Sequence, residues 1–167
     1  CGGDDCDDVK RNVAPGLPDV CDFADNVCDG VLNDDEPCWF YAHSATTLYR
    51  VDPFKGTFVE VTSVPELFDF DTHPDGTLYG IGSGDGILYR FVETTNSWDV
   101  VGQMEVIANA NGFAIDLSGT GYVTSMDHLY AVDLSAATAT DLGSIGAQFR
   151  SSGDCVVNKD DTLFMTS

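Results

Sequence analysis

Short runs of alternating apolar and polar residues, separated by turn residues, recur throughout residues 39–167. Residues 41–52 and 122–133 align without a gap, and each contains a strand pattern, a short turn and a second strand pattern ending in Leu-Tyr-x-Val-Asp. A third copy at residues 79–91 carries two extra residues in its turn. Two short strands that recur at a period of about 40 residues are typical of a propeller or a related β array.

Turn residues extend this repeat to four strands. A tight-turn sequence precedes each of Thr77, Thr120 and Thr162, and in the first two copies its glycine favours a positive φ. A strand pattern stands before each turn, at residues 68–70, 112–116 and 154–157. A further strand pattern follows each Leu-Tyr motif, at residues 57–61, 97–101 and 139–142. Four short antiparallel strands joined by tight turns are the unit of a propeller blade.

The sequence therefore predicts an all-β fold, a propeller-like array of four-stranded antiparallel blades that forms an incomplete ring in this chain. Residues 39–61 supply the last three strands of one blade, residues 68–101 and 112–142 two whole blades, and residues 154–167 the first two strands of another. Because propellers have about 4–8 blades, we expect further blades from the same chain or from a neighbouring one. The repeated aromatic residues are expected to pack between blades, namely Tyr41, Tyr79, Tyr122 and Phe164.

The charge of the chain narrows the choice of partners. It has 28 acidic and 7 basic side chains, a formal net charge of −21. Nucleic acid is excluded as a partner because phosphate binding needs clustered cations, and anionic membrane surfaces are disfavoured for the same reason. No apolar run approaches the roughly 18 residues of a membrane span. The charge favours a protein that binds cations or is adapted to salty surroundings.

Residues 1–38 differ from the repeats in composition. They are rich in aspartate, and their apolar residues follow neither a 3.6-residue nor a 2-residue period. With so little to bury, this segment would be disordered unless cross-links and bound cations held it. The sequence therefore predicts an acidic, disulfide-rich, cation-binding segment at residues 1–38, followed by β repeats at residues 39–167.

Six cysteines indicate how the acidic segment is held, and they are Cys1, Cys6, Cys21, Cys28, Cys38 and Cys155. An even number, clustered in a loop-rich stretch, favours disulfides and an oxidising compartment. Zinc is the alternative, but Cys21 and Cys28 are too widely spaced for a zinc knuckle and have no histidine nearby. The pairing stays open: a bond between Cys155 and Cys38 would staple the two ends, and an intermolecular bond would link neighbouring subunits.

Residues 25–36 match the spacing of a twelve-residue calcium-binding loop, with a glycine at its sharp turn. Val31 would offer its backbone carbonyl, and Glu36 a bidentate carboxylate. Val27 occupies a position where a ligand is usual, so Asp22 is a candidate to replace it. The candidate calcium ligands are Asp22, Asp25, Asp29, Val31, Asn33 and Glu36. The alternative is an acidic loop with no bound metal.

Residues 1–36 also resemble the metal-binding motif of MopE-type secreted bacterial proteins. The resemblance rests on Cys-Gly-Gly-Asp-Asp-Cys-Asp-Asp at residues 1–8, a Pro-Gly turn, Val-Cys-Asp at residues 20–22, Asp-Asn at residues 25–26 and Cys-Asp-Gly at residues 28–30. It implies an extracellular or cell-surface location and a cation-binding segment. It adds three aspartates to the candidate metal ligands, namely Asp5, Asp7 and Asp8.

This sequence departs from the family pattern at Phe23, where the pattern has Gly, and at Val27, where it has Asp. The resemblance favours Cys1 as an internal residue of a longer protein, the alternative being a lipidated N-terminus. It also raises copper as an alternative cofactor, through His43 with Trp39 nearby, although the spacing supplies no complete ligand set.

A search for catalytic residues finds no convincing set. The three histidines, His43, His73 and His128, fall at different positions of the repeat. No nucleophile elbow, phosphate-binding loop or zinc-peptidase signature occurs, and the carboxylates are too numerous to single out a glycosidase-like pair. The sequence therefore predicts a protein that is not an enzyme.

The leading hypothesis for function is an extracellular or cell-surface structural or adhesive module, stabilised by structural calcium and disulfides. Self-assembly through unpaired strand edges is a further hypothesis. The alternative is a ligand-binding propeller, for carbohydrate or another small molecule, or an enzymatic propeller, with its site on blades absent from this chain. It would show His, Arg or carboxylate groups converging at the central channel, and the repeated cations Arg50 and Arg90 are the first candidates.

Overall fold

The structure, a computed structural model, describes residues 6–7, 9–22, 24–32, 38–105, 107, 109–146 and 148–167. These residues contain thirteen β-strands and no helix, and among them no helical segment has the length and apolar character of a membrane span. The chain divides into two compact units, residues 1–61 and 62–167. The prediction of an all-β fold is confirmed.

The acidic segment of the first unit is organised around a polar centre. The Asn26 side chain is fully buried: its Oδ1 accepts a hydrogen bond from Val20 N at 2.9 Å, and its Nδ2 donates one to Asn12 O at 2.9 Å. Asp19 is also buried, and its Oδ1 accepts the Asn26 N–H at 2.9 Å. Hydrogen bonds to two side chains thus hold loops that have few apolar residues to bury.

Two disulfides fasten the same segment. Cys6 is bonded to Cys28, and Cys21 to Cys38. Each bond closes a loop, of 22 and 17 residues respectively, and closing loops of this size lowers the entropy of the unfolded chain. The prediction that disulfides hold the acidic segment is therefore confirmed for these four cysteines.

A three-stranded antiparallel sheet follows, in the order β1-β2-β3. Its strands are β1 (Phe40–His43), β2 (Thr47–Asp52) and β3 (Thr57–Ser63). Leu48 of β2 is fully buried. These are the three strands that the partial first blade predicts.

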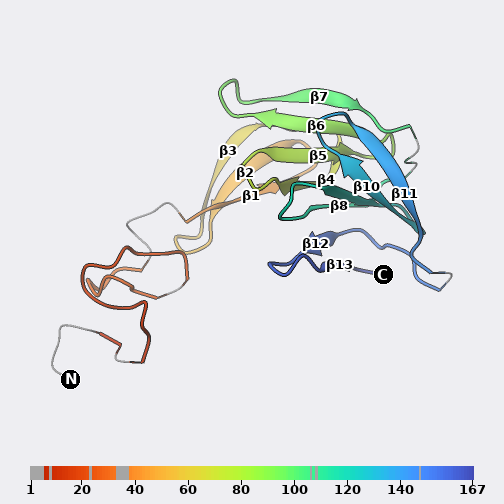
Figure 1. The fold of residues 1–167 in the computed structure, drawn as a ribbon. Coiled ribbons are helices and arrows are strands. Elements are labelled where there is room, and N and C mark those ends of the chain that lie inside the picture. The colour runs from red at the N-terminus through yellow and green to blue at the C-terminus, as the bar shows by residue number, and fades with distance from the viewer. Residues whose placement is uncertain are drawn as a thin grey trace. The chain divides into compact units, whose positions relative to one another are not determined.

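The second unit contains two four-stranded antiparallel sheets and a two-stranded one (Figure 1). The first comprises β4 (Leu67–Thr72), β5 (Leu78–Gly82), β6 (Ile87–Val92) and β7 (Ser97–Gln103). The second comprises β8 (Gly112–Ile115), β9 (Gly121–Thr124), β10 (His128–Asp133) and β11 (Thr138–Ser144). The third comprises β12 (Cys155–Val157) and β13 (Leu163–Met165). In each sheet the strands pair in sequence order, as the repeat predicts.

The turn after the first strand of each sheet has the same backbone conformation. Gly76, Gly119 and Asp161 occupy equivalent positions and have φ values of 91°, 87° and 56°. Glycine adopts this left-handed conformation without steric cost, and Asp is among the few other residues that tolerate it. This explains why the turn sequences could be recognised in the first two copies and less easily in the third.

The hydrophobic core of this unit lies between the two four-stranded sheets. It joins residues of the first sheet, such as Ile81 and Leu88, to residues of the second, such as Phe113 and Val132. Tyr79 packs against this core, as predicted for the repeated aromatic positions. Phe164, by contrast, is 53% exposed, so at this position the prediction of inter-blade packing is wrong for the described chain.

The first strands of the three sheets, β4, β8 and β12, are neighbours (Figure 1). In a propeller the first strand of each blade is the innermost one, so we refer to these as the inner strands. The side chains that they carry are therefore the ones to search for a site.

Candidate functional site on the inner strands

Two aspartates of β4 connect it to β8. Phe113 N donates a hydrogen bond to Asp69 Oδ2, and Ile115 N donates one to Asp71 Oδ2, both at 2.7 Å. The other oxygen of each carboxylate accepts the backbone N–H of the following residue. Because alternate residues of a strand point in the same direction, this pair of side chains takes the place of a backbone ladder between two neighbouring sheets.

Asp69 has an unusual protonation equilibrium. Burial raises its pKa from 3.8 to about 7, an effect that the hydrogen bonds from Phe113 N and Phe70 N oppose and the negative charges of Asp154 and Asp71 increase. Burial also raises the pKa of Asp71. An aspartate with a pKa near 7 exchanges its proton in the physiological range, whereas an ordinary surface aspartate does not.

Asp154 stands immediately before β12, and it is exposed. It occupies the position of the repeat that Asp69 occupies in β4, because each lies the same number of residues before the repeated threonine. Gly112 occupies that position in β8, and a Cβ there would lie 2.5 Å from Thr124 Oγ1 and 3.3 Å from Cys155 Sγ. The middle inner strand is therefore packed too closely at this position to carry a side chain.

Cys155 is buried beside these carboxylates, with 5% of its surface exposed. Burial raises the pKa of its thiol to about 12, and the charges of Asp69, Asp154 and Asp71 add to that effect. Asp154 and Asp71 therefore act on both Asp69 and Cys155, which places these groups in one electrostatic neighbourhood. A thiol with so high a pKa is a poor nucleophile, so Cys155 serves packing.

A buried network of polar side chains holds the chain where it enters β8 and β12. Thr124 Oγ1 lies 3.0 Å from Ser151 Oγ and donates a hydrogen bond to Asn111 Oδ1 at 3.1 Å. Asn111 Nδ2 donates a hydrogen bond to Ser151 O at 2.7 Å. Thr124 is fully buried and Ser151 nearly so. This network fixes the backbone on which Gly112 and Asp154 stand.

The arrangement suits a chemical role for Asp69. The charges that act on this carboxyl group are those of other carboxylates, so an anionic ligand would be repelled, and a neutral or cationic one is favoured. A carboxyl group with a pKa near the working pH is an efficient general acid or base. Strongly shifted pKa values are concentrated at functional sites.

The two repeated arginines, which the sequence suggests as the first candidates for a ligand site, are engaged in contacts with their own sheets. The Arg50 guanidinium stacks over the Trp39 ring, 4.4 Å from its centroid, and donates a hydrogen bond to Tyr41 OH at 3.0 Å. Arg90 lies 3.6 Å from Asp99 Oδ2. Neither belongs to an inner strand, so the charged groups to consider on the inner strands are Asp69 and Asp71 of β4 and Asp154, which precedes β12.

Each histidine has a hydrogen-bond partner of its own within a few residues or on the neighbouring strand. His43 Nδ1 is 3.0 Å from Ser44 O, and His128 Nδ1 lies 3.0 Å from the Asp141 carboxylate on the neighbouring strand. His73 stands in the β4–β5 turn, with Nδ1 at 2.8 Å from Asp75 Oδ1. The copper hypothesis gains no ligand set from His43 and Trp39, and within the described ranges no group of three metal-binding side chains occurs.

The disulfide predictions have mixed outcomes. Cys6, Cys21, Cys28 and Cys38 are paired as described above. Cys155 is a free thiol, so of the alternatives left open for it the bond to Cys38 does not form, because Cys38 pairs with Cys21 and Cys155 is buried. Cys1 lies outside the described residues.

The candidate calcium ligands are described only in part. Asp25 accepts hydrogen bonds from Asp29 N at 3.1 Å and Gly30 N at 2.8 Å, and Asp29 accepts one from Val31 N at 2.8 Å. Asp22 accepts one from Asn12 Nδ2 at 2.9 Å, and Asp7 lies 3.8 Å from Lys10 Nζ. The remaining candidates, Asp5, Asp8, Asn33 and Glu36, fall outside the described residues. The calcium site therefore stays a prediction.

Asp69, Asp71 and Asp154 were not singled out from the sequence. The sequence does show that Asp69 and Asp71 are two residues apart, and that Asp69 and Asp154 occupy the same position of the repeat. The shared repeat position is the one signal that could have found the cluster. Their burial and their contact with β8 come from the packing of separate sheets, which a local pattern does not contain.

Comparison with known proteins gives structural likenesses alone. No family model matches the chain, and no curated protein does. Among solved structures it is similar to virginiamycin B lyase from Staphylococcus aureus, with 13% identity and a TM-score of 0.55 over 77% of this chain and 44% of that one. A gluconolactonase from Xanthomonas campestris gives 18% identity and a TM-score of 0.54 over 75% and 43%. An auxiliary nutrient-binding protein from Bacteroides thetaiotaomicron gives 12% identity and a TM-score of 0.61 over 80% and 34%.

These likenesses confirm the predicted fold class, a propeller-like array of antiparallel blades. The chain spans less than half the length of each of the three structures. Two of them are enzymes, which overturns the prediction that the chain is not an enzyme: the absence of familiar catalytic motifs does not exclude catalysis in a fold of this kind. None of the three supports an adhesive role.

Proposed function

We propose that the inner strands form one wall of a small-molecule site, in a propeller that binds a ligand or acts on it as an enzyme. Asp69 is the proton-exchanging group of that site, and Asp154 lies beside it as a second, exposed carboxylate. The single observation that carries the proposal is the half-buried Asp69 carboxyl group, which accepts the Phe113 N–H of the next inner strand and is acted on by the charges of Asp71 and Asp154.

The ligand is expected to be neutral or cationic, because three carboxylates repel an anion. Its polar groups would contact the exposed Asp154 first and then the half-buried Asp69 and Asp71. If a reaction follows, Asp69 is placed to take up or release a proton while the backbone N–H of Phe113 holds its carboxylate in position.

The test is a binding screen with 15N-labelled protein. Glucono-1,5-lactone and quinupristin serve as the first probes, because similar folds include a gluconolactonase and a lyase solved with quinupristin. A bound probe is expected to shift the amide signals of Phe113, Ile115 and Cys155. Turnover of either probe is measured in parallel as a function of pH.

Two variants make the test specific. Asp69→Asn should abolish turnover and Asp154→Asn should weaken binding, whereas Asp99→Asn removes an exposed carboxylate of β7 away from the inner strands and should change neither. Probes that bind but shift only amides elsewhere, or that bind the Asp69→Asn and Asp154→Asn proteins equally well, would contradict the proposal. So would the failure of all probes to bind.

We also propose that calcium stiffens the acidic segment as a structural ion. The spacing of residues 25–36 supports this, as do the Cys21–Cys38 bond that brackets them and the Cys6–Cys28 bond that is attached within them. The disulfides indicate an oxidising compartment, which agrees with the proposed secretion to the cell surface or beyond it. Self-association stays a prediction.

A further inference from the structure

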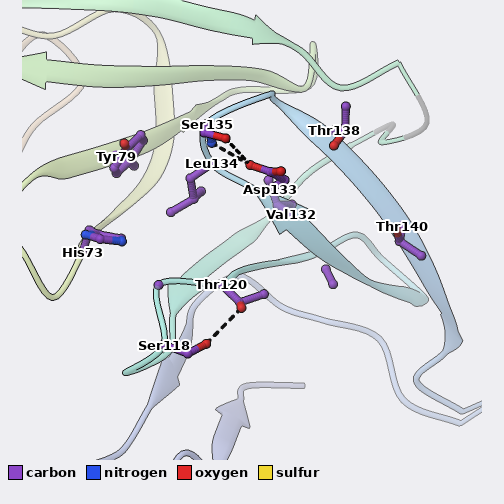
Figure 2. Close-up of a pocket in the computed structure, with 12 residues that line it drawn as sticks. His73, Tyr79, Ser118, Thr120, Val132, Asp133, Leu134, Ser135, Thr138 and Thr140 are labelled. Carbon is purple, nitrogen blue, oxygen red and sulfur yellow. Dashed lines mark hydrogen bonds between the residues drawn. The ribbon is translucent and has the colours of Figure 1, made fainter.

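A pocket of about 440 Å³ opens between the two four-stranded sheets, well within the size range of small-molecule sites. Figure 2 shows its two walls: His73 and Tyr79 come from the β4–β5 hairpin, and the remaining side chains come from the β8–β9 turn and the β10–β11 hairpin. None of its lining residues belongs to the inner-strand cluster of Asp69, Asp71 and Asp154. A ligand here would be independent of the function proposed above.

Hydroxyl groups dominate the polar lining, and they belong to Tyr79, Ser118, Thr120, Ser135, Thr138 and Thr140. A hydroxyl can donate one hydrogen bond and accept others, although Ser118 and Ser135 already donate theirs to Asp116 and Asp133 and so offer a ligand acceptors alone. Val132 and Leu134, both buried, form an apolar floor between them. The lining therefore combines an apolar base with groups that both donate and accept.

The charged groups of the pocket are few and already engaged. Asp133 Oδ1 accepts hydrogen bonds from Ser135 N at 2.9 Å and Ser135 Oγ at 2.7 Å, which ties this carboxylate into its own turn. The lining contains no lysine or arginine, and the chain carries a net charge of −21. An anion would therefore find no counter-charge, and Oδ1 of the one carboxylate in the lining is committed to its own turn.

The His73 ring faces the pocket through its second nitrogen. Its Nδ1 is engaged by Asp75, at 2.8 Å from Oδ1. Its Nε2 lies against Gly119, close enough that a Cβ at this position would clash with it, and Gly119 lines the pocket. Nε2 donates or accepts according to the tautomer, and a hydroxyl on a ligand satisfies it in either state.

We propose that this inter-sheet pocket binds a neutral polyhydroxy molecule of monosaccharide size. Only a ligand with several hydroxyl groups matches a lining whose members both donate and accept, and whose one imidazole can do either. The apolar faces of a sugar ring fit the Val132 and Leu134 floor, and the Tyr79 ring offers an aromatic surface at the opposite wall.

The test is a titration of 15N-labelled protein with D-glucose and D-galactose, and with glucose 6-phosphate as the anionic counterpart. We expect at least one neutral sugar to give saturable shifts of the amides at residues 118–120 and 131–140, at millimolar concentrations, and the phosphate to give none. No saturable shift with either neutral sugar, or equal binding of the phosphate, would overturn the proposal.

Isosteric variants separate this pocket from the inner-strand site. Replacing both Thr138 and Thr140 by Val removes two hydroxyls at constant shape and should weaken sugar binding roughly tenfold, and Tyr79→Phe should weaken it less. Thr57→Val, on an exposed position of β3, is the control for folding. Asp69→Asn should leave sugar binding unchanged, whereas wild-type affinity in the Thr138/Thr140 double variant would refute the assignment.

Discussion

The Asp69 carboxylate lies 2.7 Å from the backbone nitrogen of Phe113, which joins the inner strand of one sheet to that of the next. Asp71 and Ile115 repeat the contact two residues further along. The N–H of Leu117 beyond β8 is taken by Asp161 Oδ1 of the third sheet, at 3.1 Å. Carboxylates of both neighbouring sheets thus accept backbone N–H groups in and just after β8.

Replacing Asp69 by Asn should flatten the dependence of stability on pH. The folded pKa of Asp69 is raised above its unfolded value, so the group stabilises the folded state at low pH, and stability falls as pH rises from about 4 to about 7. The shift from 3.8 to about 7 sets an upper limit of about 4 kcal/mol on the loss. Asp69→Asn keeps one of the two acceptors, for Phe113 N or Phe70 N, and has no proton to lose, so its free energy of unfolding should change less between pH 5 and pH 8 than that of the wild type.

Denaturant unfolding at pH 5 and pH 8 measures this difference. The control is Asp99→Asn, which removes one negative charge from exposed β7 without touching β8. If Asp69→Asn and Asp99→Asn change the free energy of unfolding by the same amount at pH 5 and at pH 8, the effect comes from net charge. The burial of Asp69 would then not control the pH dependence of stability.

The pKa of the His128 imidazole should lie above its usual value of 6.5. Its hydrogen bond to Asp141 is the largest cause of a raised pKa, so the pairing is complete at low pH and is lost as pH rises through the folded pKa. Asp141→Asn should return the pKa of His128 towards 6.5, whereas Asp99→Asn should not move it. NMR titration of the imidazole signals measures this, and an unchanged His128 titration in Asp141→Asn would contradict the pairing.

Cys155 should resist thiol reagents while the protein is folded. Its thiol is buried, with a pKa raised to about 12, so the reactive thiolate is scarce at neutral pH and the reagent has no access. We expect the Cys155 peptide to remain unlabelled by a maleimide in buffer and to be labelled fully in denaturant, as mass spectrometry will show. Rapid labelling of the native protein, or a disulfide at Cys155, would contradict the structure.

The buried Asn26 amide should be essential to the acidic segment. Asn26→Asp keeps the shape, but it loses the hydrogen bond from Nδ2 to Asn12 O and places a charge near buried Asp19. We expect a loss of about 2 kcal/mol in local stability, seen as faster hydrogen exchange at Ala14 and Val20. Asn96→Asp in an exposed turn is the matched control, and equal exchange in the two variants would show that the amide contributes little.

Chelation tests the proposed calcium ion. Excess EDTA should lower the melting temperature and increase hydrogen exchange within residues 6–32, because mutually repelling carboxylates would lose their shared counter-ion. Added calcium should reverse both changes. A melting curve and an exchange pattern that do not respond to the chelator would leave the two disulfides and Asn26 as the sufficient supports of this segment.

The strands could be predicted from the sequence because their pattern is local. Alternating apolar residues, Leu-Tyr motifs and turn glycines such as Gly76 and Gly119 each act within a few residues, and the sheets formed as predicted. The site could not be predicted in the same way. Among 28 acidic residues, only the packing of one sheet against another distinguishes Asp69, and neither cysteine pairing nor the burial of Asn26 follows from spacing.

Gly112 limits how uniform the three copies of the repeat can be. Any side chain there would meet Thr124 and Cys155, although Asp69 and Asp154 occupy the equivalent position in the copies on either side. A protein built from one consensus repeat, with an aspartate at this position in every copy, would therefore not fit this packing.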